Sequence, residues 1–446
     1  MRGYVRRQSQ DAANEADEPA PRFDASVPVE EIHIPNPAIE NLPPDRYDIV
    51  GEKVTLRLAQ RPGPYVVLRY VRQVVKLKET GTFSCPPAPP AVLEKSVADV
   101  SLLAGILIDK FTMHLPLYRQ HQRMVASGIH LDRSTLTQWV HRAGALLEPI
   151  YAAQWASVLS SAVLVMDETP IKAGRLKGVG SHPGKMKTCF FWPVYGDQDE
   201  VLFPVSKTRA HGVVRELLGP FEGVLLTDGY EAYDRYAAQN AKVVQAQCWS
   251  HVRRYFVESE NVEPELSRKA LDLIGALYAH EAAIREQGLE DGAKLEFRAM
   301  HCKPVVDTFF AWLRETSEKH ILLPSSPLTK AASYALEREK ALRVFLEDPQ
   351  VPVDTNQLER EIRPIAVGRK NWLFCWTEVG AKYVGIIQSL LRTCQLQGVD
   401  RYTYLVDVLQ RIETHPAKDV HLLTPRLWKQ HFAANPLRSH IDRWRE

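Results

Sequence analysis

The sequence predicts an α/β protein built on a mixed β-sheet. Between residues 156 and 258, five short apolar segments typical of strands are separated by turn residues and by two segments with helical periodicity. Their order is three strands in succession, then helix, strand, helix and strand, and the first and fourth strands each end in an acidic residue. This order indicates a ribonuclease H-like sheet, and it is more specific than any one element.

Composition indicates a globular protein of two or three domains. The 446 residues are 45% hydrophobic and 25% charged, and the formal net charge is +2, so local basic patches would have to meet any nucleic acid. The six cysteines include no Cys-x-x-Cys pair, which argues against a disulfide framework and favours a reducing compartment. Without a secretory leader or an apolar run of membrane-spanning length, we expect a cytoplasmic protein with no membrane span.

Two segments are expected to precede the helical part of the chain. Residues 1–50 are rich in acids and prolines and have few large apolar residues, which predicts a flexible acidic tail. Residues 51–95 alternate apolar with polar residues around a Pro-Gly-Pro turn and end in a proline-rich stretch that contains Cys85. This pattern predicts a small β-hairpin module followed by a linker.

Residues 96–155 are predicted to be mainly helical and to contain a helix-turn-helix. Three apolar runs at helical spacing are separated by Leu115-Pro116 and by Ser127-Gly128. The polar face of the last run includes Arg133 and Gln138, which could contact DNA. A helical hairpin that only packs against the rest of the protein is an equally common alternative.

The part of the chain after the five strands is predicted to interrupt the core and then complete it. Residues 259–350 show helical periodicity only, which predicts a helical insertion. Residues 351–415 are expected to form the last part of the core, including an acidic helix, and residues 416–446 a C-terminal tail.

Asp167 and Asp228 stand at the ends of the first and fourth strands, which lie side by side in a sheet of this order. Two carboxylates there repel each other unless a divalent cation lies between them, and oxygen ligands suit Mg²⁺ or Mn²⁺. A third carboxylate would complete a site for two metal ions that act in phosphoryl transfer. The alternative for each aspartate is a turn cap. Glu168 is the weaker candidate, because it points to the opposite face if the strand continues.

The third carboxylate is expected on the helix that follows Val353. Asp354 is predicted to be the N-cap and Gln357 its partner in a capping box. Glu359 then shares one face with cations of the same helix, whereas Glu361 is rotated away from it and is predicted to face solvent. Glu359 is therefore the predicted metal ligand.

Basic residues around these acids are predicted to hold DNA phosphates. The segment from Lys172 to Lys187 has no acid, which predicts a flexible cationic loop, and a solvated loop without contacts is the alternative. Pro364 is expected to end or kink the acidic helix and to present the cations that follow it. Cys248 and His251 form only half of a zinc site, so Cys248 is expected to pack at the end of the fifth strand and His251 to face the active site or the DNA backbone. The expected DNA-contacting residues of this part are Lys172, Arg175, Lys177, Arg253, Arg254, Arg363, Arg369, Lys370 and Trp372.

The motifs VMDETP, LLTDGYEAYDRY, QCWSHVRRYF and DTNQLEREIRPIAVGRKNWLF resemble bacterial transposases of the insertion sequence sixty-six family, over about residues 80–430. The resemblance implies a DDE-type enzyme with a ribonuclease H-like core split by an insertion. It assigns the catalytic and metal-binding roles to Asp167, Asp228 and Glu359. Two Mg²⁺ or Mn²⁺ ions are then expected in each active site.

The resemblance also implies partners and a location. Double-stranded DNA at the terminal inverted repeats and target DNA are expected, with a homo-oligomer assembled on DNA, small companion proteins and a nucleoid-associated place in the cytoplasm. Similar proteins carry a cysteine-rich zinc module before the proline linker, whereas Cys85 stands alone here, which argues against zinc.

Two alternatives stay open from the sequence. One is a catalytically inactive relic that binds the ends of the element as a regulator. The other is a stand-alone ribonuclease H-like nuclease, which shares the chemistry and differs in its substrate. The presence of all three acids favours an enzyme over the inactive relic.

Overall fold

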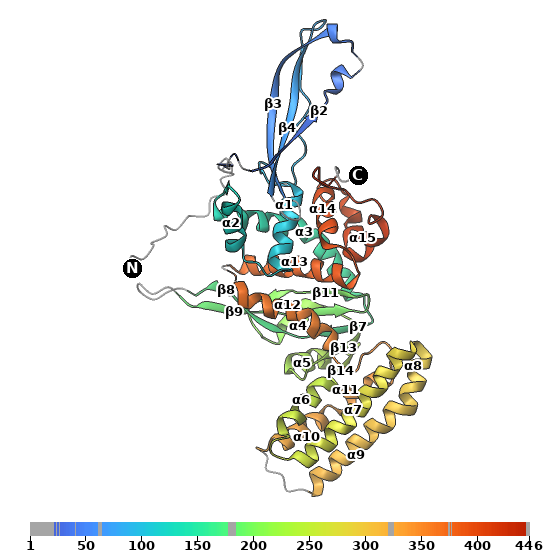
Figure 1. The fold of residues 1–446 in the computed structure, drawn as a ribbon. Coiled ribbons are helices and arrows are strands. Elements are labelled where there is room, and N and C mark those ends of the chain that lie inside the picture. The colour runs from blue at the N-terminus through green and yellow to red at the C-terminus, as the bar shows by residue number, and fades with distance from the viewer. Residues whose placement is uncertain are drawn as a thin grey trace. The chain divides into compact units, whose positions relative to one another are not determined.

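The computed structural model describes residues 22–442, except residues 24, 26, 41, 61–64, 177–183, 320–324, 373, 374 and 376. The chain forms two compact units whose elements are labelled in Figure 1. The first unit comprises Met1–Ile106, Leu117–Ala143 and Arg438–Glu446, and the second comprises Leu107–Pro116 and Gly144–Leu437. Among the described helices, none combines the length and the apolar character that crossing a membrane would need.

The first unit contains a β-sheet in the order β2-β4-β3. β3 (Tyr47–Gln60) and β4 (Tyr65–Leu77) are antiparallel, β2 (Val29–Ile34) runs parallel to β4, and β5 (Phe83–Ser84) also pairs with β4. The structure therefore contains the predicted hairpin, but it differs from the predicted flexible tail over residues 29–34 and 47–50. Alternation explains the difference, because β2 packs Ile32 and Ile34 against the apolar cluster of the sheet.

Helices of the first unit follow the sheet. α1 (Val100–Phe111) begins in this unit, and α2 (Leu117–Ala126) is joined to α3 (Arg133–Leu159) by a turn and the short strand β6 (Ile129–His130), which pairs with β1 (Arg22–Phe23). Gly128 has a φ of 78° in this turn, a conformation that favours glycine. The start of α3 buries Leu136 and Trp139. The helix-turn-helix connectivity is present, and its role in DNA binding stays a prediction.

The second unit is a mixed α/β structure around a five-stranded sheet. Its strand order is β11-β10-β7-β13-β14, formed by Glu200–Leu202, Val194–Gly196, Val163–Met166, Gly223–Thr227 and Val243–Gln247. β10 is antiparallel to both β11 and β7, whereas β13 is parallel to both β7 and β14. The predicted adjacency of the first and fourth strands is thus confirmed.

A second, three-stranded sheet has the order β12-β9-β8, formed by Val205–Ser206, Met186–Phe191 and Thr169–Arg175. The chain passes between the two sheets at three interruptions, which lie at residues 167–168, 192–193 and 203–204. Pro193 and Pro204 stand at two of these places, and a proline cannot donate a hydrogen bond to a neighbouring strand.

β8 changes the interpretation of the predicted cationic loop. Lys172 and Arg175 lie on this strand rather than in a loop, because Ile171 and Ala173 alternate with them into the core. Lys177 lies outside the described residues.

One face of the five-stranded sheet is covered by helices. α4 (Gly212–Leu218), α5 (Glu231–Gln239) and the end of α3 pack on apolar residues of β7, β10, β11 and β13 in one buried cluster. Trp192 belongs to this cluster, and Trp249, the first residue of α6 (Trp249–Ser259), is also buried. Both tryptophans therefore pack in the core.

α13 (Glu378–Leu396) covers the outer edge of β11 with small and hydroxyl-bearing residues one turn apart. The amide of Phe203 donates to Ser389 Oγ (2.9 Å), and the amide of Val201 donates to Thr393 Oγ1 (3.1 Å). Gly385 completes this stripe where the helix backbone approaches the strand. Backbone groups of an edge strand are therefore satisfied by helix side chains.

Residues 264–346 form helices in the part that the structure describes. They are α7 (Pro264–Gln287), α8 (Asp291–Phe297), a π-helical turn (Arg298–Cys302), α9 (Lys303–Lys319), α10 (Pro327–Glu337), α11 (Glu339–Leu342) and a 3-10 turn (Val344–Leu346). Arg298 is fully buried and forms a two-pronged ion pair with Glu281 at 2.8 and 2.9 Å. Its remaining donors reach the carbonyl oxygens of Phe345 and Asp348, so the buried charge is fully hydrogen-bonded.

α12 (Asn356–Trp372) begins later than the capping box predicts. Asp354 accepts from the amide of Asn356 (2.9 Å), but the side chain of Gln357 donates to Asp199 (3.2 Å) instead of closing the box. The helix also continues through Pro364 to Trp372 rather than ending there. A contact of Gln357 with the β10–β11 turn thus replaces the predicted capping box. No local sequence pattern encodes this contact.

The C-terminal segment is folded. After α14 (Arg401–Arg411), a 3-10 segment (Ala417–Leu423) leads into α15 (Pro425–His431), where Trp428 is only 2% exposed. Tyr404 Oη donates to the carbonyl oxygen of Leu423 (2.9 Å) and joins this segment to α14. Residues 416–437 thus belong to the second unit and residues 438–442 to the first, where Ile441 is buried in the apolar cluster of the sheet, so this segment does not form a free tail.

We expect the Gly385→Ala substitution to lower the stability of the protein. A Cβ at this position would lie 2.2 Å from the carbonyl oxygen of Phe203, so α13 and β11 would have to separate. Overpacking of this kind costs about 1–3 kcal/mol of unfolding free energy. The measurement is the melting temperature of the purified full chain.

A matched control is Gly275→Ala in α7, where a Cβ meets nothing within 4 Å. Better helix propensity should stabilise this variant by about 0.5–1 kcal/mol. Equal melting temperatures for the two variants would show that α13 does not approach β11 closely.

Candidate active site

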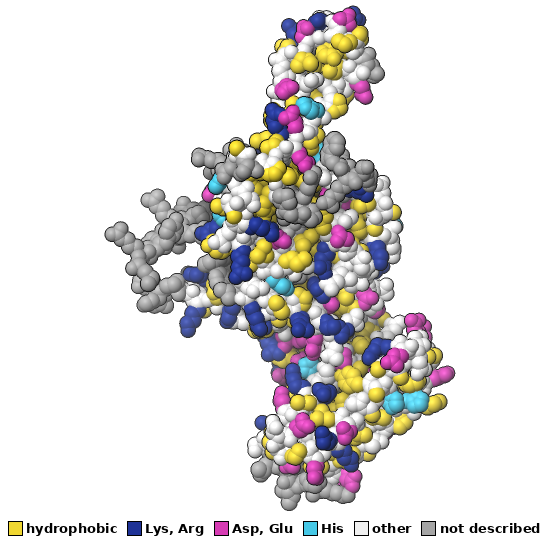
Figure 2. Space-filling model, viewed as in Figure 1, with side chains coloured by type: hydrophobic (Ala, Val, Ile, Leu, Met, Phe, Trp, Pro, Cys, Tyr) yellow, Lys and Arg dark blue, Asp and Glu magenta, His cyan; other side chains and the backbone are white. Residues whose placement is uncertain are grey.

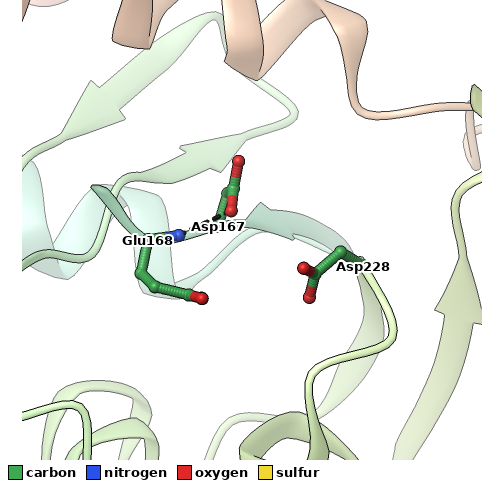
Figure 3. Close-up of side chains that lie close together, drawn as sticks. All are labelled: Asp167, Glu168 and Asp228. Atoms are coloured by element: carbon green, nitrogen blue, oxygen red, sulfur yellow. Dashed lines mark hydrogen bonds between the residues drawn. The ribbon is translucent and has the colours of Figure 1, made fainter. Parts of the chain in front are cut away.

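Three carboxylates meet where β7 and β13 end. One oxygen each of Asp167, Glu168 and Asp228 lies within 4.8 Å of the others, and this is the single group of three or more potential metal ligands found among the described residues. Figure 3 shows the three side chains around one space, with Asp228 facing the two acids that follow β7. Parallel strands bring their carboxyl ends to the same edge of a sheet, which explains why Asp167 and Asp228 converge.

Glu168 joins the cluster because the strand is interrupted. The amide of Asp167 still donates to the carbonyl oxygen of Pro193 (3.3 Å), but its carboxylate already accepts from the amide of Glu168 (2.7 Å). The prediction that Glu168 points to the opposite face assumed a continuous strand, and the break between β7 and β8 makes it wrong. Prolines at the same level of the neighbouring strands are the sequence signal for this break.

Glu168 is held firmly on its outer side. Tyr233 Oη donates to Glu168 Oε2 (2.7 Å), and Arg209 forms an ion pair with Oε1, so the Glu168 side chain is only 4% exposed. The Arg209 guanidinium also lies 4.0 Å from the centre of the Tyr230 ring. Burial raises the pKa of Glu168, and the hydrogen bonds from Tyr233 and Arg209 oppose this rise.

Asp228 has two roles in the structure. The amide of Tyr230 donates to its Oδ1 (2.9 Å) and closes the turn that leads into α5. The turn-cap alternative is therefore correct for one oxygen, while Asp228 also supplies a carboxylate oxygen to the cluster. A turn cap of this kind fixes the orientation of the carboxylate.

The electrostatics of the cluster favour a bound cation. Burial raises the pKa of Asp167 to about 7, and the charges of Asp228 and Glu168 raise it further, whereas the Glu168 amide and His251 lower it. A carboxyl group with this pKa is poorly stabilised as an anion. Oxygen ligands in this arrangement fit a hard divalent cation, whose charge would offset both the burial and the repulsion.

Cys248 and His251 lie at the corner between β14 and α6, next to the acids. Burial acts to raise the pKa of Cys248, but the hydrogen bond and charge of His251 outweigh it, so the pKa is lowered. Burial acts to lower the pKa of His251, and Cys248 and Asp228 raise it overall. His251 Nδ1 is buried and has no hydrogen-bond partner. The position of His251 beside the acids agrees with the expectation that it faces the active site or the DNA backbone.

Glu359 is exposed on α12 and lies outside the carboxylate cluster. Its Oε1 is 3.5 Å from Thr355 Oγ1, one turn earlier in the chain. Glu361 is only 5% exposed and forms an ion pair with Arg392 of α13 at 2.7 Å. The prediction that Glu361 faces solvent is therefore wrong, because the helix face opposite Glu359 packs against α13.

The predicted DNA-contacting residues of the second unit are mostly exposed. Lys and Arg side chains gather over β8, β9 and α12 on the face shown in Figure 2. Arg369 donates to Thr169 Oγ1 (3.1 Å) and to the carbonyl oxygen of Pro170 (2.6 Å), which places α12 beside β8. Lys172 donates to Thr188 Oγ1 at 2.6 Å. The other exposed cations on these elements and on α6 are Arg175, Arg253, Arg254, Arg363 and Lys370, whereas the side chain of Trp372 lies outside what the structure describes.

In the first unit, Arg133 and Gln138 are exposed near the start of α3, and the Arg133 guanidinium lies 5.6 Å from the centre of the Tyr118 ring of α2. Cys85 is half-buried, and no second zinc ligand groups with it among the described residues. Zinc binding in the hairpin module thus gains no support from these residues.

Comparison with known proteins identifies the family. Residues 95–383 match the Transposase IS66 family, and residues 389–425 match the IS66 C-terminal element. The first match alone spans more than half of the chain, so the chain belongs to the IS66 transposase family. The resemblance to this family that the sequence motifs indicated is thereby confirmed.

The chain also matches individual proteins. The chain is similar to the uncharacterized protein y4jD of Sinorhizobium fredii, with 32% identity over 85% of this chain and 76% of that protein. It is 30% identical to y4hP of the same organism, over 87% of this chain and 73% of that protein. Among solved structures, the Drosophila P element transposase strand transfer complex aligns with a TM-score of 0.36 and 11% identity, over 70% of this chain and 93% of that chain.

We expect the Asp167→Asn substitution to stabilise the metal-free protein more at pH 8 than at pH 5. The pKa of Asp167 rises from 3.8 to about 7 in the folded protein, so the folded state holds a proton that the unfolded state has lost. Wild-type stability therefore falls as the pH rises through this window, whereas the amide does not titrate. Melting temperatures in the presence of a chelator measure the difference.

Asp307→Asn provides a control of opposite sign. Hydrogen bonds from Lys303 and Arg343 lower the pKa of Asp307, so its charge stabilises the folded state above the ordinary aspartate pKa and this contribution is lost as the pH falls. The control variant should melt at a lower temperature than the wild type at pH 8. A stability gain in Asp167→Asn that is the same at both pH values would contradict the raised pKa.

Proposed function

We propose that the chain is a DDE-type transposase with a ribonuclease H-like catalytic core, which cleaves and joins DNA at the ends of its own insertion sequence. The observation that carries the proposal is the convergence of Asp167 and Asp228 at the ends of two adjacent parallel strands, β7 and β13. Membership of the IS66 transposase family supports DNA as the substrate. The strand order around β7 is also the order predicted for a ribonuclease H-like sheet.

Asp167 and Asp228 would hold divalent cations, Mg²⁺ or Mn²⁺, with two ions in each site. The donor set consists of carboxylate oxygens only, which suits hard cations, and burial raises the pKa of Asp167, so a bound cation would stabilise its charged form. Such ions supply Lewis-acid stabilisation of the phosphate and a more acidic attacking water or hydroxyl. The break between β7 and β8 points the first acid out of the sheet, and the Tyr230 amide orients the second.

Glu359 is the proposed third acid. A short chain of hydrogen bonds joins its helix turn to the strand of Asp228, through Thr227, Cys248 and Thr355. Its exposed position leaves it able to turn toward the cluster, which a side chain on the buried face of α12 could not do. Glu168 is assigned a different role: it anchors Arg209 beside the site, where the guanidinium can hold a phosphate.

Cations of the second unit would steady the DNA strand at the site. Arg363, Arg369 and Lys370 follow Glu359 on α12, and the backbone of Cys375, just after this helix, pairs with β8 next to Lys172. Contacts from such residues to phosphates give affinity without reading sequence. Arg175, Arg253 and Arg254 would extend the same surface, and Lys177 and Trp372 are proposed from the sequence alone.

Recognition of the terminal inverted repeats is assigned to the first unit. Arg133 and Gln138 are both exposed near the start of α3, the second helix of the helix-turn-helix, where such residues contact base edges. Two ends of an element must be brought together for joining, so we propose a homo-oligomer on DNA. Companion small proteins are carried over from the family resemblance.

A second candidate function is a regulator that binds the ends without chemistry. The observation that favours it is the position of Glu359, which lies outside the carboxylate cluster. Incubation of the purified chain with Mn²⁺ and labelled terminal repeats separates the possibilities. Joined products support the transposase, nicks alone indicate a nuclease, and a mobility shift without cleavage indicates the regulator.

Asp228→Asn should abolish Mn²⁺-dependent cleavage of labelled terminal repeats while leaving DNA binding unchanged. Loss of one carboxylate removes a metal ligand, but the amide can still accept the hydrogen bond from Tyr230 and keep the turn. The control is Glu231→Gln, an exposed acid on α5 whose pairing with Arg235 does not involve the cluster. Strand transfer by Asp228→Asn at the wild-type rate would contradict the assignment of Asp228 as a metal ligand.

The two glutamates of α12 should respond in opposite ways. Glu359→Gln is expected to abolish cleavage without changing the melting temperature, because the side chain is exposed and its contact with Thr355 Oγ1 is long, at 3.5 Å. Glu361→Gln is expected to reduce stability by about 2 kcal/mol, since it weakens a buried charge-assisted hydrogen bond with Arg392. Cleavage assays and thermal melts of both variants decide between the roles, and cleavage by Glu359→Gln would exclude Glu359 as the third acid.

A further inference from the structure

Cys248 stands at the junction of three elements that carry the site. It follows β14 and precedes α6, and its amide donates to the carbonyl oxygen of Thr227, the residue before Asp228. The adjacent amide of Trp249 donates to the carbonyl oxygen of Val353, just before α12. Backbone hydrogen bonds thus join the end of β13, the start of α6 and the approach to α12 at one corner.

The sulfur of Cys248 accepts hydrogen bonds from Thr355, the residue that precedes α12. Both the amide and the hydroxyl of Thr355 lie 3.3 Å from Sγ, within the range of N–H···S and O–H···S contacts. Ser250 Oγ lies 2.9 Å from the same sulfur. Cys248 and Thr355 are both buried, so water does not compete for these donors.

Thr355 connects this corner to the third acid. Its hydroxyl lies 3.5 Å from Glu359 Oε1, and its carbonyl oxygen accepts from the amide of Glu359 (3.0 Å). The first turn of α12 has no capping box to define its start, because Gln357 is turned toward Asp199. The sulfur therefore accepts from the amide of Thr355 while Asp354 accepts from the amide of Asn356, and the two acceptors together hold the start of this helix.

We infer that Cys248 is a positioning residue of the active site, whose sulfur fixes the first turn of α12 and thereby the distance of Glu359 from Asp228. The inference rests on the proposed function for its effect on cleavage, but the contact itself does not. A cysteine that only filled space would contact apolar side chains, whereas this sulfur lies within hydrogen-bonding distance of three polar groups, the amide and hydroxyl of Thr355 and the hydroxyl of Ser250. Residues that orient metal ligands from behind typically alter metal affinity by about 10–100-fold when removed.

The test compares Cys248→Ala and Cys248→Ser with the wild-type full chain. Hydrogen–deuterium exchange of the 353–360 segment is measured without metal, and cleavage of labelled terminal repeats is measured against Mn²⁺ concentration. Cys248→Ala should exchange faster in this segment and should need about tenfold more Mn²⁺ for half-maximal cleavage, with DNA affinity in a chelator unchanged. Cys248→Ser should recover most of the wild-type behaviour, because its oxygen accepts the same hydrogen bonds.

Cys302→Ala is the matched control, since it removes another buried thiol, from the helical insertion, without a contact to α12. It should leave both the exchange of residues 353–360 and the Mn²⁺ requirement at wild-type values. Thr355→Val removes the hydroxyl and keeps the sulfur and the volume, so it tests the same contact if Cys248→Ala does not fold. This variant should shift the Mn²⁺ requirement in the same direction.

Wild-type exchange and a wild-type Mn²⁺ requirement in Cys248→Ala would overturn the inference, as would an equal change in Cys302→Ala. Faster exchange at residues 353–360 in Cys248→Ala, combined with no cleavage by the wild type under any condition, would reject the proposed function. In that case the contact between Cys248 and α12 would stand as a structural feature. The two failures are therefore distinguishable.

Discussion

The repulsion between carboxylates at the ends of β7 and β13 is the constraint on which the second unit depends. Parallel pairing fixes the two strands side by side, so Asp167 and Asp228 cannot move apart without breaking the sheet. Their burial adds to the electrostatic cost, as the raised pKa of Asp167 shows. A folded protein retains such an arrangement when another component offsets it, and a divalent cation is the component that fits the oxygen donors.

Several features around the acids serve to hold this unfavourable arrangement. The chain is interrupted at residues 167–168, 192–193 and 203–204, between strands of the two sheets. Asp167 therefore lies just outside the regular strand. Tyr233 and Arg209 bind Glu168 from behind, and the Tyr230 amide binds Asp228. These contacts hold the carboxylates from outside the cluster, so the space between the three acids can accept a ligand. The stability of the core is thus used to keep a charged site in a fixed geometry.

Much of the core could be predicted from the sequence, because strands and helices leave periodic apolar patterns. The order of the five strands and the adjacency of Asp167 and Asp228 follow from these patterns. The place of Glu168 does not, since it depends on a strand break shared with two distant segments at Pro193 and Pro204. The strand at residues 29–34 was likewise obscured by its acids, because Glu30 occupies the same half-buried face as Ile32 and Ile34 and interrupts the apolar alternation.

The contacts of α12 were also not predictable from the sequence. Helical spacing places Glu359 and Glu361 on different faces, but it does not say which face meets the rest of the protein. Arg392, which pairs with Glu361, lies on a different helix, and Asp199, which binds Gln357, lies more than 150 residues earlier. Partners this distant leave no local signal, so the start of α12 and its buried side became visible only in the folded chain.

The covering of β11 by α13 has a consequence for assembly. The hydroxyls of Ser389 and Thr393 accept from the amides of Phe203 and Val201, which an added strand would need for pairing. Gly385 allows the backbone of α13 to lie directly against this edge. Another copy of this chain therefore cannot enlarge the sheet by adding a strand along that border. Any sheet extension between copies must use another edge, and the five-stranded sheet is protected from edge-to-edge association at β11.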